Sequence, residues 1–300
     1  MNKILIIGGT GFIGYHLAKK CLKKNFKVTS LSKRPPKKIR FLNKVKYIIC
    51  DINDEKKLKK RITANFNYIV NLGGYVNHQN KRETYRSHYL GLKKLTEIFI
   101  QKKIKKFIQI GSSMEYGRVK SPQKEIFNCY PESTYATSKF LSTKHLMTLY
   151  KKKNFPAVIL RLYQVYGPNQ DKNRLIPIII DSCKNNKSFP CSNGEQLRDF
   201  LFVDDLIDAI LRCLDNKVEG KIINIGSGKI IKVKKIIDQI VNFYKAGRPL
   251  FGKIKLRKEE MLKVYPSLLN ARKFLRWKAK VSFNSGILKT INFYDRNNLN

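Results

Sequence analysis

A tyrosine and a lysine four residues apart, Tyr135 and Lys139, have the types and spacing of a proton-transfer pair. On a helix they would lie one turn apart on the same face. A phenol has a pKa of about 10 and is a poor base at neutral pH, and a neighbouring ammonium group is expected to lower that pKa. A serine hydroxyl within reach, for which the serine-rich strand end upstream is a source, would hold a substrate oxygen. Together the three could move a proton to or from an alcohol or ketone.

The first fourteen residues predict a site for a dinucleotide. An apolar run of strand length, residues 4–7, precedes three glycines spaced three apart, and an amphipathic stretch follows them. Glycines permit a tight turn, close approach of a ligand and close packing of helix on strand, and the first N–H groups of the helix can bind a pyrophosphate. A glycine-rich structural turn is the alternative. We expect cofactor contacts from this segment at Gly8, Gly11, Phe12, Ile13 and Gly14.

The elements that position these residues follow a βαβ pattern. Apolar runs alternate with helices of ten or more residues, including a helix predicted over 82–103, and this alternation is typical of a parallel sheet. We therefore expect an α/β fold with a Rossmann-like doubly wound parallel sheet and a smaller C-terminal α/β substrate-binding portion. The predicted division is a dinucleotide-binding domain over 1–168, to which 200–226 returns, and a substrate-binding portion over 169–199 and 227–300.

The ends of the predicted strands indicate which nicotinamide cofactor binds. The second strand ends at Ser32, Lys33 and Arg34, without the carboxylate that accepts hydrogen bonds from the adenosine ribose of NAD. Basic residues there pair with a 2′-phosphate, so we expect NADP in preference to NAD. The alternative is that Lys33 and Arg34 are ordinary surface cations without a role in cofactor binding. Further cofactor contacts are expected at the ends of the third and fourth strands, from Asp51, Ile52, Leu72 and Gly73.

The charge is the unusual bulk property: 62 Lys and Arg against 21 Asp and Glu give a net charge of +41. A nucleic-acid partner is one reading, but the cations are spread along the chain and form no basic stripe interleaved with aromatic residues. The field would favour an anionic substrate. No apolar run approaches the ~20 residues of a membrane span, and the six cysteines and four histidines show no metal spacing. We expect a cytoplasmic protein without a membrane or metal partner.

Five motifs resemble those of the extended short-chain dehydrogenase/reductase family, which comprises nucleotide-sugar epimerases, dehydratases and reductases. The resemblance covers nearly the whole chain. It rests on GGTGFIG (8–14), GSSMEYG (111–117), YATSK (135–139), RLYQVYGP (161–168) and GEQLRDF (194–200). It implies that Tyr135 is the catalytic acid/base, that Lys139 binds the nicotinamide ribose, and that Ser112 is the hydroxyl partner. Substrate contacts implied by the resemblance are those of Gln164, Arg198 and Arg257, the two arginines reaching a diphosphate.

Departures from the family pattern exclude one of the family's reactions. The sugar 4,6-dehydratases have Asp and Glu where this chain has Ser113 and Met114, and a methionine cannot move a proton. Glu115 is one place late and, on a strand, would point to the opposite face. Dehydration is therefore not expected. His88 replaces the family's usual asparagine, and we expect it to be a partly buried structural residue.

The resemblance and the strand ends together favour NAD(P)-dependent reduction of a 4-keto (6-deoxy)hexose attached to a nucleotide. Epimerisation at C4 with a retained NAD is the alternative, and a nucleic-acid-binding protein on a dehydrogenase-like scaffold is the alternative of another class. Both the predicted helix over 82–103 and the helix that carries Tyr135 have more apolar residues than one buried face needs. In the family these helices pair across a twofold axis, so a homodimer is expected.

Overall fold

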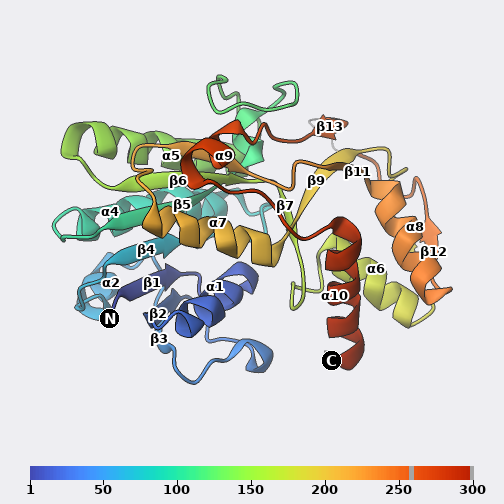
Figure 1. The fold of residues 1–300 in the computed structure, drawn as a ribbon, viewed down its shortest axis with the longest axis horizontal. Coiled ribbons are helices and arrows are strands. Elements are labelled where there is room, and N and C mark those ends of the chain that lie inside the picture. Colours follow the sequence, from blue (N-terminus) through green and yellow to red (C-terminus); the bar gives the residue numbers. More distant parts are fainter. Residues whose placement is uncertain (257–259, 298–300) are drawn as a thin grey trace.

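The computed structural model describes residues 1–256 and 260–297, and its centre is a sheet of seven parallel strands. The strand order is β10-β6-β5-β4-β1-β2-β3, so the chain winds outward in both directions from β1. This confirms the predicted Rossmann-like fold (Figure 1). The strands are β1 (Lys3–Ile7), β2 (Lys27–Ser32), β3 (Lys46–Ile49), β4 (Tyr68–Asn71), β5 (Lys106–Ser112), β6 (Ala157–Leu162) and β10 (Ile222–Ile225).

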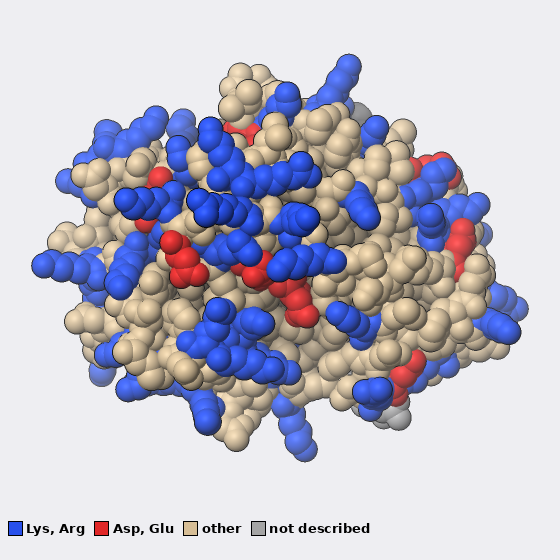
Figure 2. Space-filling view, in the orientation of Figure 1, with Lys and Arg blue, Asp and Glu red and all other residues tan. Residues whose placement is uncertain are grey.

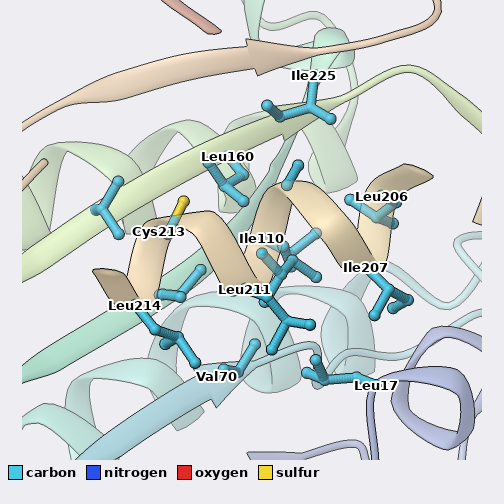
Figure 3. Packing of buried hydrophobic residues seen from close by; sticks show 14 of the residues in the cluster. Leu17, Val70, Ile110, Leu160, Leu206, Ile207, Leu211, Cys213, Leu214 and Ile225 are labelled. Carbon is cyan, nitrogen blue, oxygen red and sulfur yellow. The ribbon is translucent and has the colours of Figure 1, made fainter. Parts of the chain in front are cut away.

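Side chains alternate between two cores, one on each face of this sheet. In β1, Ile4 and Ile6 pack on one face, whereas Leu5 and Ile7 pack on the other. The first core is covered by α1 (Phe12–Lys23), α7 (Val203–Asp215) and α9 (Leu269–Leu275). Figure 3 shows α7 laying its apolar side chains on the strands. The second core is covered by α2 (Glu55–Arg61), α4 (Gly91–Phe99) and α5 (Thr134–Lys153).

A second lobe lies beside the carboxyl ends of the strands. Its core joins the helices α6 (Leu175–Lys184), α8 (Val233–Tyr244) and α10 (Phe283–Arg296), which Figure 1 shows at the right. Strand β9 is central in its small sheet and pairs with three others. The remaining strands are β7 (Gln164–Tyr166), β8 (Ser188–Pro190), β9 (Leu197–Phe202), β11 (Ile230–Lys232), β12 (Arg248–Leu250) and β13 (Lys263–Val264).

The C-terminal segment contacts both lobes. Helix α10 packs in the second core, whereas α9 and the fully buried Trp277 pack in the first core, beside the main sheet. The indole Nε1 of Trp277 donates a hydrogen bond to the carbonyl oxygen of Asp205 at 3.1 Å. Arg276, between α9 and Trp277, has a φ of +48°, a conformation that glycine adopts at less cost.

The helix predicted over 82–103 is present over 81–99, but it is not a regular α-helix throughout. It is built from α3 (Lys81–Tyr85), a π-helical turn (Arg86–Leu90, η2) and α4. The π turn contains one residue more than an α-helical turn, and such turns occur often at functional sites. His88 lies in this turn and is buried, whereas a partly buried position was expected.

The surface shows how the large positive charge is distributed. Figure 2 shows Lys and Arg scattered over the whole visible face, with small groups of Asp and Glu among them. All six cysteines are free thiols. In the part of the chain that the structure describes, no helix combines the length and apolar character that crossing a bilayer requires.

Candidate active site

The structure brings the three predicted catalytic side chains together where β5 ends beside α5. Ser112 is the last residue of β5, and its hydroxyl hydrogen-bonds the phenol of Tyr135. Ser133 caps α5 by accepting a hydrogen bond from the backbone N–H of Ala136 at 3.2 Å, which fixes the first turn where Tyr135 lies. The Lys139 ammonium nitrogen lies 5.9 Å from the centre of the Tyr135 ring.

The electrostatics of this pair differ from the expectation. Burial raises the pKa of Tyr135, although the hydrogen bond from Ser112 and the charge of Arg174 act in the opposite direction. Burial also lowers the pKa of Lys139 to about 8. The ammonium donates a hydrogen bond to the backbone carbonyl of Ile110 at 2.8 Å rather than to the phenol. The pKa of Tyr135 is therefore raised, not lowered as predicted, and the phenol is protonated at neutral pH.

Glu115 organises the polypeptide around Ser112. It lies in a short 3₁₀ helix (Ser113–Tyr116, η3), not on a strand as expected, and is fully buried. Its Oε1 accepts the backbone N–H of Ser112 at 2.8 Å. Its Oε2 accepts the hydroxyl of Thr143, on α5, at 2.8 Å and pairs with the Arg161 guanidinium, on β6, at 3.0 Å. One carboxylate thus joins the serine strand, the tyrosine helix and the next strand.

Two histidines flank Tyr135, and sequence reasoning missed this arrangement. The His78 ring stacks on the phenol with centroids 4.0 Å apart and an interplanar angle of 15°. The His88 ring meets the same phenol edge to face at 5.0 Å. Burial, followed by the charge of Lys139, holds the pKa of His88 well below its usual value, so its imidazole is neutral. Because His78 is far from Tyr135 in the sequence, no local pattern indicates this contact.

The glycine turn forms a cradle that fits a dinucleotide. Gly8 has a φ of +77°, and a Cβ on it would lie 3.1 Å from the backbone of Leu72 and Gly73. A Cβ on Gly14 would lie 2.4 Å from the carbonyl oxygen of Gly8. The residue that caps α1 is Gly11, which has no side chain to occupy the N–H groups of the first turn, around Phe12 and Ile13. The turn therefore presents bare backbone, which suits a pyrophosphate.

The predicted adenosine contacts gather at the neighbouring strand ends. The Ser32 hydroxyl accepts the backbone N–H of Thr10 at 3.3 Å, which joins β2 to the glycine turn. The Lys33 ammonium pairs with the carboxylate of Asp51 at 2.9 Å, so part of its charge is already balanced. The carbonyl oxygen of Arg34 accepts the hydroxyl of Thr10 at 3.3 Å. The side chain of Ile52 reaches the strand end at Gly73.

A cavity of about 570 Å³ opens next to the catalytic residues and is lined by both lobes. Gln164 and Arg198, two of the predicted substrate contacts, line it. The Arg198 guanidinium pairs with the carboxylate of Glu260 at 2.8 Å and donates to the carbonyl oxygen of Leu262 at 3.2 Å. Arg257 lies outside the described residues. The cavity begins one residue from Ser112, at Ser113.

The buried ammonium leads to a prediction about stability. The fall in the pKa of Lys139 from 10.5 to about 8 corresponds to a cost of ~3 kcal/mol while the amine is charged. We expect Lys139→Met to raise the free energy of unfolding by about 2 kcal/mol at pH 7, since about 1 kcal/mol is lost with the hydrogen bond to Ile110. The gain should be full below pH 8 and fade as the pH rises to 10.5, because the folded wild-type protein loses this proton before the unfolded chain does.

Urea unfolding at pH 7 and at pH 10.5 measures this difference. Lys144→Met, which removes an exposed ammonium from the same helix, is the control and should change little at either pH. An equal loss of stability in Lys139→Met at both pH values would contradict the prediction.

Comparisons with known proteins agree with the fold and the motifs. A protein of Methanocaldococcus jannaschii, provisionally named a UDP-glucose 4-epimerase, is 28% identical over 98% of this chain and 99% of its own length. The dTDP-4-dehydro-6-deoxyglucose reductase of Escherichia coli is 27% identical over 80% of this chain and 81% of its own length.

A solved structure of the UDP-glucose 4-epimerase of Thermotoga maritima with UDP-glucose superposes with a TM-score of 0.93 at 23% identity, covering 98% of this chain and 99% of that one. The model of the NAD-dependent epimerase/dehydratase family matches residues 4–226, about three quarters of the chain. With its glycine cradle, its Ser112, Tyr135 and Lys139 and this match, the chain belongs to the NAD-dependent epimerase/dehydratase family and is an enzyme of nucleotide-sugar metabolism.

Proposed function

We propose that this enzyme reduces the 4-keto group of a nucleotide-linked hexose with NADPH. The observation that carries the proposal is the placement of Tyr135. Its phenol is hydrogen-bonded to Ser112 beside a cavity of substrate size, and it is protonated at neutral pH because burial raises its pKa further above the ordinary value of about 10. A protonated phenol is ready to act as the acid that a ketone reduction requires. The E. coli relative named as a 4-dehydro-6-deoxyglucose reductase supports the same assignment.

In the proposed reaction each of four side chains has a separate role. The Ser112 hydroxyl holds the carbonyl oxygen, and the Tyr135 phenol donates its proton to that oxygen as the alcohol forms. Lys139, turned from the Ile110 carbonyl, would hold the ribose of the cofactor and stabilise the phenolate left behind. When bound, the nicotinamide supplies the hydride. Glu115 holds Ser112 and α5 in register throughout.

C4 epimerisation with a retained NAD is the second candidate, favoured by the relative provisionally named a UDP-glucose 4-epimerase. In an epimerase the tyrosine would first take the C4 hydroxyl proton as a base and then return it, while the C4 hydride would pass to NAD and be given back, so that the cofactor is regenerated in each turnover and need not leave. Conversion of UDP-glucose to UDP-galactose by the purified enzyme, without added cofactor, would establish this candidate in place of the reductase.

The proposed preference for NADP rests on Lys33 and Arg34. β2 ends at Ser32, the next two residues are the basic Lys33 and Arg34, and this strand end has no carboxylate of its own. The Asp51 carboxylate is bound to Lys33 instead of being free to accept bonds from a ribose. Arg34, whose planar guanidinium suits a phosphate, is then the main candidate for the 2′-phosphate, and Lys33 would add to it.

We also propose that the enzyme is a homodimer. α5 and the segment from α3 to α4 lie side by side, since the hydroxyl of Thr96 and Nε2 of His145 are 2.9 Å apart. Leu92, Leu95 and Phe99 on α4 are fully buried against the sheet, so they are not free to pair with a partner. The surface left for pairing is therefore half-buried and partly aromatic: Tyr85, Tyr89, Leu90, Phe140 and Leu141.

One prediction tests the role of the Tyr135 phenol as the proton donor. We expect Tyr135→Phe to lower the turnover of a 4-keto sugar by ~10²–10⁴-fold, because it removes the proton that the reduction needs and keeps the ring. NADPH oxidation measures turnover, and nucleotide fluorescence measures cofactor binding, which should stay near that of the wild type. Tyr130→Phe, which removes an exposed hydroxyl, is the control. Wild-type turnover in Tyr135→Phe would end the proposed mechanism.

The second prediction concerns the cofactor. Alanine at both Lys33 and Arg34 should weaken NADPH binding by tenfold or more, since each charge-assisted contact is worth about 1.5–3 kcal/mol, and should affect NADH much less. Alanine at both Lys23 and Lys24, at the far end of α1, removes the same net charge and serves as the control. Equal weakening of the two cofactors by the first variant would refute the NADP assignment.

The third prediction concerns assembly. Two subunits of +41 repel each other, and salt shortens the range of that repulsion to about 8–10 Å. We expect the dimer to tighten as ionic strength rises, which sedimentation velocity from low to high salt can measure. A fully active monomer at every salt concentration would rule the dimer out.

A further inference from the structure

Met114 places an apolar side chain beside the catalytic serine. Its backbone N–H donates to the Ser112 hydroxyl at 3.2 Å, so its position relative to the catalytic oxygen is fixed by the short 3₁₀ helix. The side chain lines the cavity and is 43% exposed. The same cavity is also lined by polar residues, among them Ser113, Ser133 and Gln164. The Met114 side chain exposes apolar surface to water, and a bound ligand that covers this surface would gain affinity from the contact.

The second lobe also contributes exposed apolar side chains to the cavity. Leu175 and Ile178, on the first turn of α6, also line the cavity and are 37% and 39% exposed. α6 begins near the catalytic end, because the charge of Arg174, the residue that precedes it, acts on the Tyr135 phenol. Apolar side chains thus face the cavity from both lobes close to the reacting position.

We propose that Met114 selects the sugar, and that the substrate is a 6-deoxy sugar whose C6 methyl group packs against the Met114 side chain. The inference rests on the proposed function, since it takes Ser112 and Tyr135 to hold the oxygen on C4. The groups on the neighbouring carbons must then lie within a few ångströms of Ser112, where Met114 is. Two carbons adjoin C4: C5, which carries C6, and C3. A C6 methyl group would pack against the exposed Met114 thioether, whereas a C3 that has lost its hydroxyl would present only a hydrogen and leave a gap.

A 6-hydroxyl in the same place would lose its hydrogen bonds to water against a side chain that returns only a weak acceptor. Apolar sites discriminate against an added hydroxyl by at most about 100-fold. The expected preference for the 6-deoxy sugar is therefore about 10- to 100-fold in kcat/KM. Because Met114 is the lining side chain tied to Ser112, we assign most of the discrimination to it, and a polar side chain of the same length should remove most of the preference.

The experiment compares sugars that differ only at C6. dTDP-fucose and dTDP-galactose, and the UDP-linked pair, are oxidised with NADP⁺ by the wild type, by Met114→Gln and by Met114→Leu. The Gln variant should reduce the preference for the fucose compounds by about tenfold, since its amide can hydrogen-bond the 6-hydroxyl. The Leu variant, apolar and similar in volume, should keep the preference within about threefold. A wild type without preference, or a Gln variant with an unchanged one, overturns the proposal.

Binding to Tyr135→Phe separates this proposal from the proposed function. Calorimetry with the same four compounds measures affinity in a protein that does not turn them over. A preference for the fucose compounds that is lost in Tyr135→Phe/Met114→Gln supports the role of Met114, even if no NADP⁺-dependent oxidation occurs and the reductase assignment fails. Equal affinities for the two sugars of each pair overturn the role of Met114 while leaving the reductase intact. Absence of binding by all four overturns both.

Discussion

The Glu115 carboxylate is the interaction on which the catalytic geometry depends. It is buried among groups from three elements: the backbone of Ser112 at the end of β5, the hydroxyl of Thr143 on α5, and the guanidinium of Arg161 on β6. A charge taken fully out of water is tolerable only with such a complete set of partners. The same carboxylate leaves no room for a side chain at Gly111, where a Cβ would lie 2.5 Å from Oε1. The separation between the serine and the tyrosine helix is therefore set by one hydrogen-bonded anion.

Burial shapes the site in a second way, because it disfavours charge on both members of the Tyr135 and Lys139 pair. The phenol keeps its proton, and the charged ammonium is destabilised although it donates a hydrogen bond to the carbonyl oxygen of Ile110. Stability is commonly given up in this way where side chains are arranged for activity.

Much of the fold and of the cofactor cradle was predictable from the sequence, because both rest on local rules. The sheet strands follow from apolar runs of strand length, and the turn around Gly8 follows from glycines that precede a helix. Both patterns are local and do not depend on distant residues. The pairing of Lys33 with Asp51 and the stacking of His78 on Tyr135 join residues 18 or more places apart, through loops whose conformation no local pattern specifies. The prediction that Glu115 lies on a strand is wrong for the same reason. Its orientation follows from a 3₁₀ turn directly after β5, where side chains do not alternate between two faces as they do in a strand.

The π-helical turn at Arg86–Leu90 has a consequence for how the catalytic tyrosine is flanked. An α-helix advances by about 100° for each residue, so a turn that holds one extra residue rotates everything on one side of it relative to the other. The carbonyl oxygen of His88 is thereby directed to the hydroxyl of Ser142 on α5, at 2.8 Å, while the His88 ring contacts Tyr135. Shortening this segment by one residue would restore an ordinary helix and turn the imidazole away, although every side chain kept its identity. The environment of the phenol is thus determined partly by chain length, which substitution experiments alone do not sample.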